Sequence, residues 1–183
     1  MPIKERVLKV SIFLCSIIYT LAAWKWGDWR NWKTYYPTIL FFLVGDLLYQ
    51  FLFHDYSMWE FENLRVESLI HLNHTHISLF LMAVKYPATI LIYLGNFPKR
   101  PIYQFLYILL WVFIYCLNEL TNLWLGVISF HNSWHFGWSI LFNFSMFVIL
   151  FVHHKKPLLA WGISAVFIFF LWNVHGIPKD ILK

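Results

Sequence analysis

Apolar residues dominate six stretches of the chain, each about long enough to cross a lipid bilayer. A membrane-spanning helix needs about 20 such residues, and lengths of about 17–25 are tolerated. The sequence therefore predicts an all-α fold, a polytopic transmembrane bundle of about six helices with short loops, in a single domain over residues 1–183. The predicted spans are about 7–26, 37–53, 76–94, 102–128, 134–152 and 157–173.

Prolines mark the start of three spans. Pro37, Pro101 and Pro157 stand at or just before a first helical turn, where a missing backbone N–H costs nothing and the fixed φ suits helix entry. Because the connections are short, we expect consecutive helices to be antiparallel neighbours. The basic start resembles a signal peptide with a small-residue site at Thr20-Leu21-Ala22, but we expect it to be retained as the first span.

Two connections differ from plain turns. Residues 24–36 mix Trp and Tyr with charged residues, a composition typical of a segment in the headgroup layer. The longer connection from His54 to Thr75 is acidic, and Ser57 and Glu60 have the spacing of a capping box that would start a helix at Met58. We therefore expect one acidic surface helix in this connection.

The composition agrees with a membrane protein. Hydrophobic residues make up 60% of the chain and charged residues 13%, whereas roughly a quarter of the residues of soluble domains are charged. The net charge of +5 comes from scattered basic residues, which suits contact with anionic lipids better than binding of nucleic acid. We expect a multi-pass protein of the cell membrane whose partners are lipids and either another protein or further copies of itself, with no nucleic acid.

The basic residues are almost evenly divided between the two predicted sides of the bundle. One side carries Lys25, Arg30, Lys33, Lys99, Arg100, Lys155 and Lys156, and the other carries Lys4, Arg6, Lys9, Arg65, Lys179 and Lys183. Because short loops carry the orientation signal best, we predict that the compact basic loops are cytoplasmic and that both termini lie outside.

Three charged residues interrupt the apolar spans near their middles: Asp46, Lys85 and Glu119. A charged side chain at the centre of a membrane helix costs at least about 2.5–3.5 kcal/mol, so a mutually neutralising cluster is expected. Their formal charges sum to −1, which predicts either one further bound cation or one protonated carboxyl. The alternative is an internal ion pair that only fixes helix packing.

Further polar residues recur at helical spacing and are expected to support this cluster. Asn118 and Asn122 lie on the flank of Glu119, and Ser139 and Asn143 are one turn apart in the next span. Such side chains commonly join membrane helices by hydrogen bonds. The two flanks are therefore predicted to face each other inside the bundle.

The histidines suggest a different chemistry. His131 and His135 could bind one Zn²⁺ if both lie on the fifth helix, with His71 or His74 as a third ligand and Glu119 activating water. The alternative function is accordingly a membrane-embedded zinc-dependent hydrolase. An isolated His-x-x-x-His pair is a weak signal, so the favoured interpretation includes no cofactor and no catalytic residue.

The layout of residues 35–160 resembles a family of small, functionally uncharacterised multi-pass membrane proteins of spore-forming Gram-positive bacteria. The resemblance rests on Phe42-Leu43-Val44-Gly45-Asp46, Lys85-Tyr86-Pro87, Asn118-Glu119 and the aromatic turn from Ile128 to His135. Where that family more usually has Gly-Trp-Asn, this chain has Ser133-Trp134-His135. The resemblance implies a membrane bundle and no particular activity. The sequence thus predicts a non-enzymatic helper, a sensor or a small cation- or proton-linked membrane protein.

Overall fold

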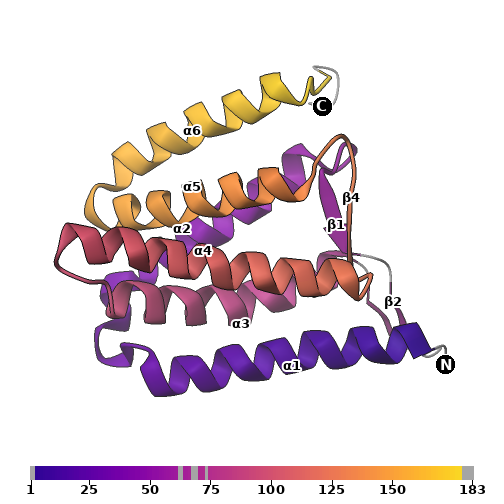
Figure 1. Cartoon of the computed structure of the whole chain (residues 1–183), viewed down its shortest axis with the longest axis horizontal. Helices are drawn as coiled ribbons and strands as arrows, with labels where there is room; N and C mark the ends of the chain where they lie inside the picture. The colour runs from indigo at the N-terminus through magenta and orange to yellow at the C-terminus, as the bar shows by residue number, and fades with distance from the viewer. Residues whose placement is uncertain (1–2, 62–63, 67–69, 73, 179–183) are drawn as a thin grey trace.

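Six helices make up most of the part of the protein that the structure describes. This computed structural model describes residues 3–61, 64–66, 70–72 and 74–178, and its helices run back and forth along one direction (Figure 1). The helices are α1 (Ile3–Trp26), α2 (Trp32–Leu52), α3 (His74–Gly95), α4 (Pro101–Trp124), α5 (Phe136–Lys155) and α6 (Pro157–Val174), with a short 3₁₀ helix at Trp29–Asn31. The predicted helical bundle is confirmed.

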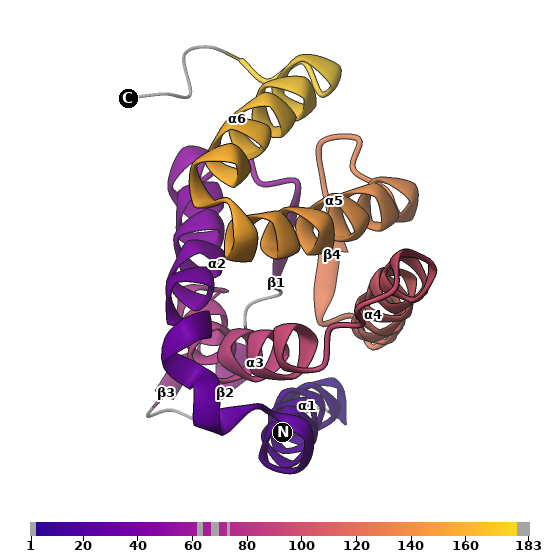
Figure 2. The same cartoon turned by 90° about the vertical axis from the view of Figure 1, so that its left-hand side faces the viewer.

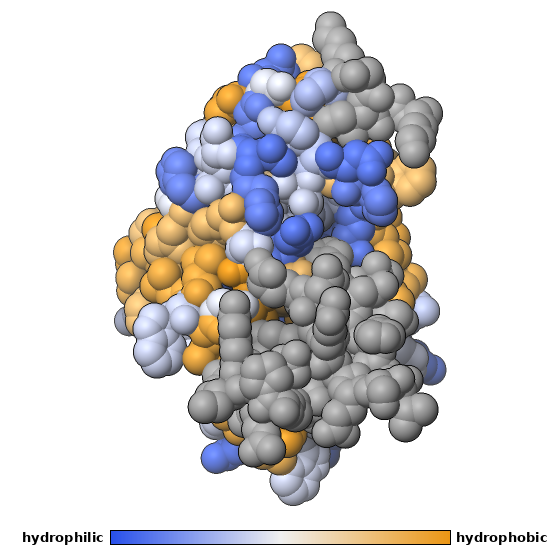
Figure 3. All heavy atoms as spheres, turned by 90° about the vertical axis from the view of Figure 1, so that its right-hand side faces the viewer, coloured by the Kyte–Doolittle hydropathy of each residue, from blue (hydrophilic) through white to orange (hydrophobic). Residues whose placement is uncertain are grey.

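Four helical segments of the described chain are long and apolar enough to cross a membrane, judged by length and composition: Trp29–Leu52, Pro101–Trp124, Phe136–Lys155 and Pro157–Val174. The third predicted span contributes a shorter apolar stretch, Leu79–Gly95. On the face seen in Figure 3, hydrophilic residues gather at the end of the bundle that carries the strands, and hydrophobic residues flank them.

The helices surround the centre of the bundle rather than following one another in a row. α1 packs on α3, α2 contacts α3 and α5, and α5 lies between α4 and α6. Figure 2 shows α2, α3, α4 and α5 arranged around the central axis. The expectation that consecutive helices are neighbours holds for most pairs but is wrong for α1, whose main partner is α3. The loop after α1 fixes this placement, because the Asp28 N–H donates to the Leu91 carbonyl of α3 at 3.2 Å.

Aromatic rings fill the core between α3, α4 and α5. Tyr93 and Phe147 are fully buried, and their ring centroids lie 5.1 Å apart. The Tyr93 hydroxyl donates to the Phe147 carbonyl at 2.9 Å, and the Tyr115 ring meets the Phe147 ring edge-on at 4.9 Å. Interlocked rings of this kind hold the three helices in one register.

Two of the three prolines that were predicted to mark helix starts do so. Pro101 and Pro157 are the first residues of α4 and α6, as predicted. Pro37, however, lies inside α2, which already begins at Trp32. The fourth span ends at Trp124 rather than near residue 128, because Gly126 adopts a left-handed φ of 66° that turns the chain out of the helix.

Short strands replace the predicted surface helix. β1 (Trp59–Phe61) pairs antiparallel with β4 (Ile128–Phe130), and β2 (Leu64–Val66) pairs with β3 (Ile70–Leu72). The expectation of a helix starting at Met58 is therefore wrong, and the fold is mostly helical with two small strand pairs.

Hydrogen bonds explain why the helix does not start at Met58. The backbone N–H groups of Met58 and Trp59 donate to the Tyr49 hydroxyl at 3.0 and 3.2 Å. The Ser57 hydroxyl donates to the Glu60 carboxylate instead of accepting from a backbone N–H. The groups that a capping box would use are thus occupied elsewhere.

Candidate functional site

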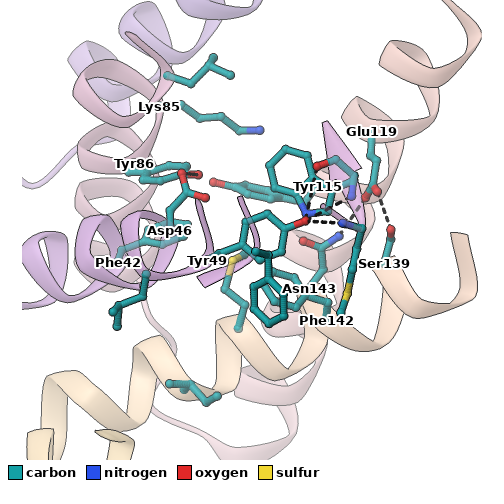
Figure 4. A pocket seen from close by; sticks show the side chains of 18 of the residues that line it. Phe42, Asp46, Tyr49, Lys85, Tyr86, Tyr115, Glu119, Ser139, Phe142 and Asn143 are labelled. Carbon is teal, nitrogen blue, oxygen red and sulfur yellow. Dashed lines mark hydrogen bonds between the residues drawn. The ribbon is translucent and has the colours of Figure 1, made fainter. Parts of the chain in front are cut away.

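A cavity of about 290 Å³ lies among the helices, and all three charged residues predicted from the sequence line it. Asp46 comes from α2, Lys85 from α3 and Glu119 from α4, and each side chain is half-buried because it borders this space. Figure 4 shows them together with the polar residues around them. The expected supporting residues also line the cavity: Asn118, Asn122, Ser139 and Asn143.

Glu119 is held by two residues of α5 that are one helical turn apart. The Ser139 hydroxyl donates to Oε1 of Glu119 at 2.5 Å, and the Asn143 amide donates to Oε2 at 3.4 Å. Ser139 in turn accepts from the indole N–H of Trp134 at 3.0 Å. Both carboxylate oxygens are therefore acceptors, as in an ionised carboxylate, and the two polar flanks predicted to face each other do so.

Lys85 is held by a neutral amide and by aromatic faces. Its ammonium donates to Oδ1 of Asn118 at 3.1 Å. The same nitrogen lies 4.3 Å from the centroid of the Tyr115 ring and 5.4 Å from that of Tyr19. A cation over an aromatic face is attracted by the ring quadrupole, and more strongly so away from water.

Asn118 is itself fixed by hydrogen bonds from both sides. Its amide nitrogen donates to Sγ of Cys15 on α1 at 3.2 Å, and Asn122 donates to its backbone carbonyl at 2.9 Å and to its Oδ1 at 3.3 Å. The amide oxygen is thereby turned toward Lys85. α1 thus takes part in the site, which the sequence did not predict.

Asp46 uses only one of its two carboxylate oxygens. Oδ2 accepts from the Tyr86 hydroxyl at 3.0 Å and from the Gln50 amide at 3.3 Å. The Tyr86 ring is stacked on Phe42 with centroids 4.0 Å apart, which fixes the hydroxyl. Among the described residues, Oδ1 of Asp46 has no hydrogen-bond partner.

The three charges share the cavity without forming a direct ion pair. In the described part of the chain, ion-pair contacts within 4.0 Å join His54 to Asp55 and His131 to Glu60, and none joins Lys85 to a carboxylate. Neutral donors and acceptors therefore satisfy each charge separately. A buried charge can be stabilised in this way when its hydrogen bonds are well placed.

The histidines of the zinc hypothesis do not lie on one helix. α5 begins at Phe136, so His135 is its N-cap and accepts from the Gly137 N–H. His131 lies in the turn before the helix, with Ser129 and Glu60 as its partners at 2.9 and 3.4 Å.

The other two candidate zinc ligands cannot be placed at the site. His71 belongs to β3 and His74 begins α3, and their side chains lie outside the described part of the structure. Over the described ranges, no group of three His, Cys, Asp or Glu residues could hold a metal ion. The geometric premise of the zinc hypothesis, a His-x-x-x-His pair on one helix, is therefore wrong.

Comparison of this chain with known proteins assigns it to no family. No family model, no curated protein and no solved structure matches this chain. The similarity in layout to membrane proteins of spore-forming bacteria therefore stays a prediction.

Several residues of the site carry no clear signal in the sequence. Tyr86, Trp134 and Tyr19 all lie in or beside apolar stretches that are rich in aromatic residues, where lipid contact is the ordinary expectation. Tyr86 directly follows Lys85, which is the one available hint. The charged residues could be found because an ionisable group in an apolar stretch is rare, whereas their aromatic partners are common there.

Proposed function

We propose that the chain is a multi-pass integral membrane protein of the cell membrane, without classical enzymatic chemistry, that takes up one proton or one cation in its central cavity. The surface of the bundle supports the membrane location. Large apolar side chains with exposed fractions of 70% or more project from the helices: Trp24, Phe51, Trp124, Leu158, Val166 and Phe169. Such side chains are unfavourable in water and favourable in hydrocarbon.

The convergence of Asp46, Lys85 and Glu119 on one cavity carries the proposal. Two carboxylates and one ammonium sum to −1, and this excess is attractive to one proton or cation. Ionisable residues inside membrane bundles are costly and commonly mark ion pathways or proton relays. Because each group already has neutral partners, the role of an internal ion pair is not needed to explain their position.

Such a protein acts as a sensor or as a helper of another membrane component, since occupancy of the cavity changes the charge balance among four helices. An occupant that binds only the folded state stabilises it, by about 2.7 kcal/mol at one hundred times its Kd. The occupied and empty forms therefore differ in stability. A partner protein or a second copy of the chain can respond to that difference.

The experiment is a thermal unfolding series on purified protein in detergent. We expect the Tm to rise with acidification or with one monovalent cation at constant ionic strength, and this rise to be lost in Asp46→Asn and Glu119→Gln. Asp55→Asn is the matched control, because Asp55 is exposed outside the cavity. Equal responses of the wild type and both cavity variants would contradict the proposal.

The zinc-dependent hydrolase is the competing hypothesis, and it makes a separate prediction. Elemental analysis after chelator-free purification would find about one zinc per chain, lost on changing His131 and His135. The N-cap position of His135 and the contact between His131 and Glu60 disfavour it.

A further inference from the structure

Most of the cavity wall is apolar, although its charged residues first draw attention. Apolar residues of α2, α5 and α6 line the cavity together with the charges: Leu48, Phe142, Met146, Phe167, Ile168 and Leu171. A bare metal ion or a proton is bound by polar atoms alone and makes no favourable contact with an apolar wall. A large apolar lining with a few polar groups is typical of sites for organic ligands.

The charges in the cavity select for a positive ligand. The excess of one carboxylate over the single ammonium attracts a cation, and Oδ1 of Asp46 has no hydrogen-bond partner among the described residues. An anionic ligand could pair with Lys85, but it would meet two carboxylates at the same time. Like charges that share a low-dielectric site repel strongly.

Aromatic faces in the cavity are suited to an organic cation. The Lys85 ammonium lies 4.3 Å from the centroid of the Tyr115 ring, so this wall is already in contact with one positive charge. Tyr49 and Trp59 add a stacked pair, with centroids 5.3 Å apart, and both line the cavity. Recognition of organic ammonium groups by aromatic walls follows from the ring quadrupole.

On one side the cavity is lined by residues of α2 and α6. Two aromatic pairs lie between them, Phe41 of α2 with Trp161 at 4.7 Å and Phe53, directly after α2, with Trp172 at 5.6 Å. Between Phe41 and Phe53 on α2 lies Gly45, which is exposed and lines the cavity, and a Cβ added there would meet nothing within 4 Å. We take this flank of the bundle at Gly45, directly beside Asp46, as the lateral window through which a ligand enters.

We propose that the cavity binds a lipophilic organic cation, which enters from the bilayer between α2 and α6. This inference rests on the proposed function and names the class of its occupant. The positive group lies between Asp46 and the aromatic rings, and the apolar part lies against α5 and α6. A membrane-dissolved ligand reaches this site without crossing the polar ends of the protein.

The test uses two probes of nearly the same size and opposite charge, tetraphenylphosphonium and tetraphenylborate. Equilibrium binding to the full chain in nanodiscs is expected to give saturable uptake of the phosphonium, about one per chain, and much weaker uptake of the borate. Asp46→Asn should weaken phosphonium binding at least tenfold, and Asp55→Asn should leave it unchanged. Lys85→Met should strengthen it at least threefold, a gain that a merely misfolded variant cannot produce.

The window is tested by a side chain that fills it. Gly45→Leu should slow phosphonium association at least fivefold, whereas Gly162→Leu on α6, also in open space but outside the cavity lining, should not. Tighter binding of the borate, or equal phosphonium binding by the wild type and Asp46→Asn, would overturn the inference. One result would separate this inference from the proposed function. If the phosphonium does not bind while the Tm still depends on protons or a small cation through Asp46, the inference is contradicted and the proposed function is supported.

Discussion

The carboxylate of Glu119 illustrates how single side chains make the interior of this bundle tolerable for charge. Ser139 and Asn143 donate to its two oxygens, and Trp134 completes the chain of hydrogen bonds behind Ser139. Neutral donors of this kind stabilise a carboxylate without requiring a counter-charge. Among the described residues, no ion pair within 4.0 Å joins the Lys85 ammonium to either acid.

Removing the Ser139 hydroxyl should therefore be costly. In Ser139→Ala, the Trp134 indole loses its acceptor and Oε1 of Glu119 loses its closest donor, and each unsatisfied group costs about 1–3 kcal/mol. We expect a loss of about 2–4 kcal/mol in the free energy of unfolding, measured by denaturant titration in mixed micelles. Ser164→Ala is the matched control, because Ser164 lines the same cavity but donates only to the Ala160 carbonyl of its own helix. Equal losses in both variants would contradict the network.

Tyr19 gives the opposite prediction. Its hydroxyl is buried and has no hydrogen-bond partner among the described residues, whereas its ring faces the Lys85 ammonium. Tyr19→Phe removes the unsatisfied group and keeps the ring, so we expect a gain of about 1 kcal/mol in stability. Thermal unfolding of the two proteins in the same detergent checks this, and a clear loss would mean that the hydroxyl has a partner.

At the level of side chains, the sequence predicted the charges and three of their polar partners, Asn118, Ser139 and Asn143, but not their aromatic partners. Asp46, Lys85 and Glu119 were predicted to be together because a lone charge in hydrocarbon is expensive. The sequence contains no comparable penalty that would reveal Tyr86 or Trp134. Their polar tips matter only after the helices have brought them within reach of a carboxylate or a hydroxyl.

Among the secondary-structure elements, hydrophobic periodicity predicts the helices, whereas contacts between residues far apart in sequence determine the strands. All six helices were located because each long apolar stretch has one stable way to satisfy its backbone away from water. The surface helix was predicted from Ser57 and Glu60 and is wrong, because β1 pairs with β4, a strand that lies far away in sequence. Local spacing cannot reveal such a partner.

Gly45 also departs from expectation. A glycine in a membrane span often allows another helix to approach closely, yet a Cβ added at Gly45 would meet nothing within 4 Å. A glycine that does allow close approach between distant segments is Gly95 at the end of α3, where a Cβ would lie 2.6 Å from the Cβ of Asp28. Hydrogen bonds from Asn31 and Tyr35 hold the pKa of Asp28 below its ordinary value and hold this residue in place.

The two glycines form a matched pair for mutation. Gly95→Ala should destabilise the protein by about 1–3 kcal/mol, because the added methyl group must displace the loop after α1. Gly45→Ala should be neutral or stabilising by up to about 1 kcal/mol, since alanine is favoured over glycine inside a helix. Thermal unfolding of both variants is the measurement. A larger loss for Gly45→Ala than for Gly95→Ala would refute the packing of the loop on α3.

The molecule as a whole has two different ends. The connections after α1, α3 and α5 lie at one end (Figure 1) and carry Lys25, Arg30, Lys33, Lys99, Arg100, Lys155 and Lys156. The other end holds both termini, the strands and the exposed pairs of His54 with Asp55 and His131 with Glu60. A compact basic end is expected on the cytoplasmic side of a membrane.

Cysteine labelling tests this orientation. In a background without Cys15 and Cys116, Lys99→Cys should react with a membrane-impermeant maleimide only after the cells are permeabilised. His54→Cys, at the opposite end and with 83% of the native side chain exposed, should react in intact cells. The reverse pattern would show that the termini are cytoplasmic.

The hydrogen bond between Lys85 and Asn118 also bears on how the protein is made. Its two residues are 33 positions apart in the chain, so α3 leaves the ribosome before the helix that satisfies its ammonium. α3 also contributes only the shorter apolar stretch, Leu79–Gly95. In the membrane location proposed above, a nascent chain that stops before α4 holds a short segment whose cation lacks its Asn118 partner, and we expect stable insertion of α3 to depend on the arrival of α4.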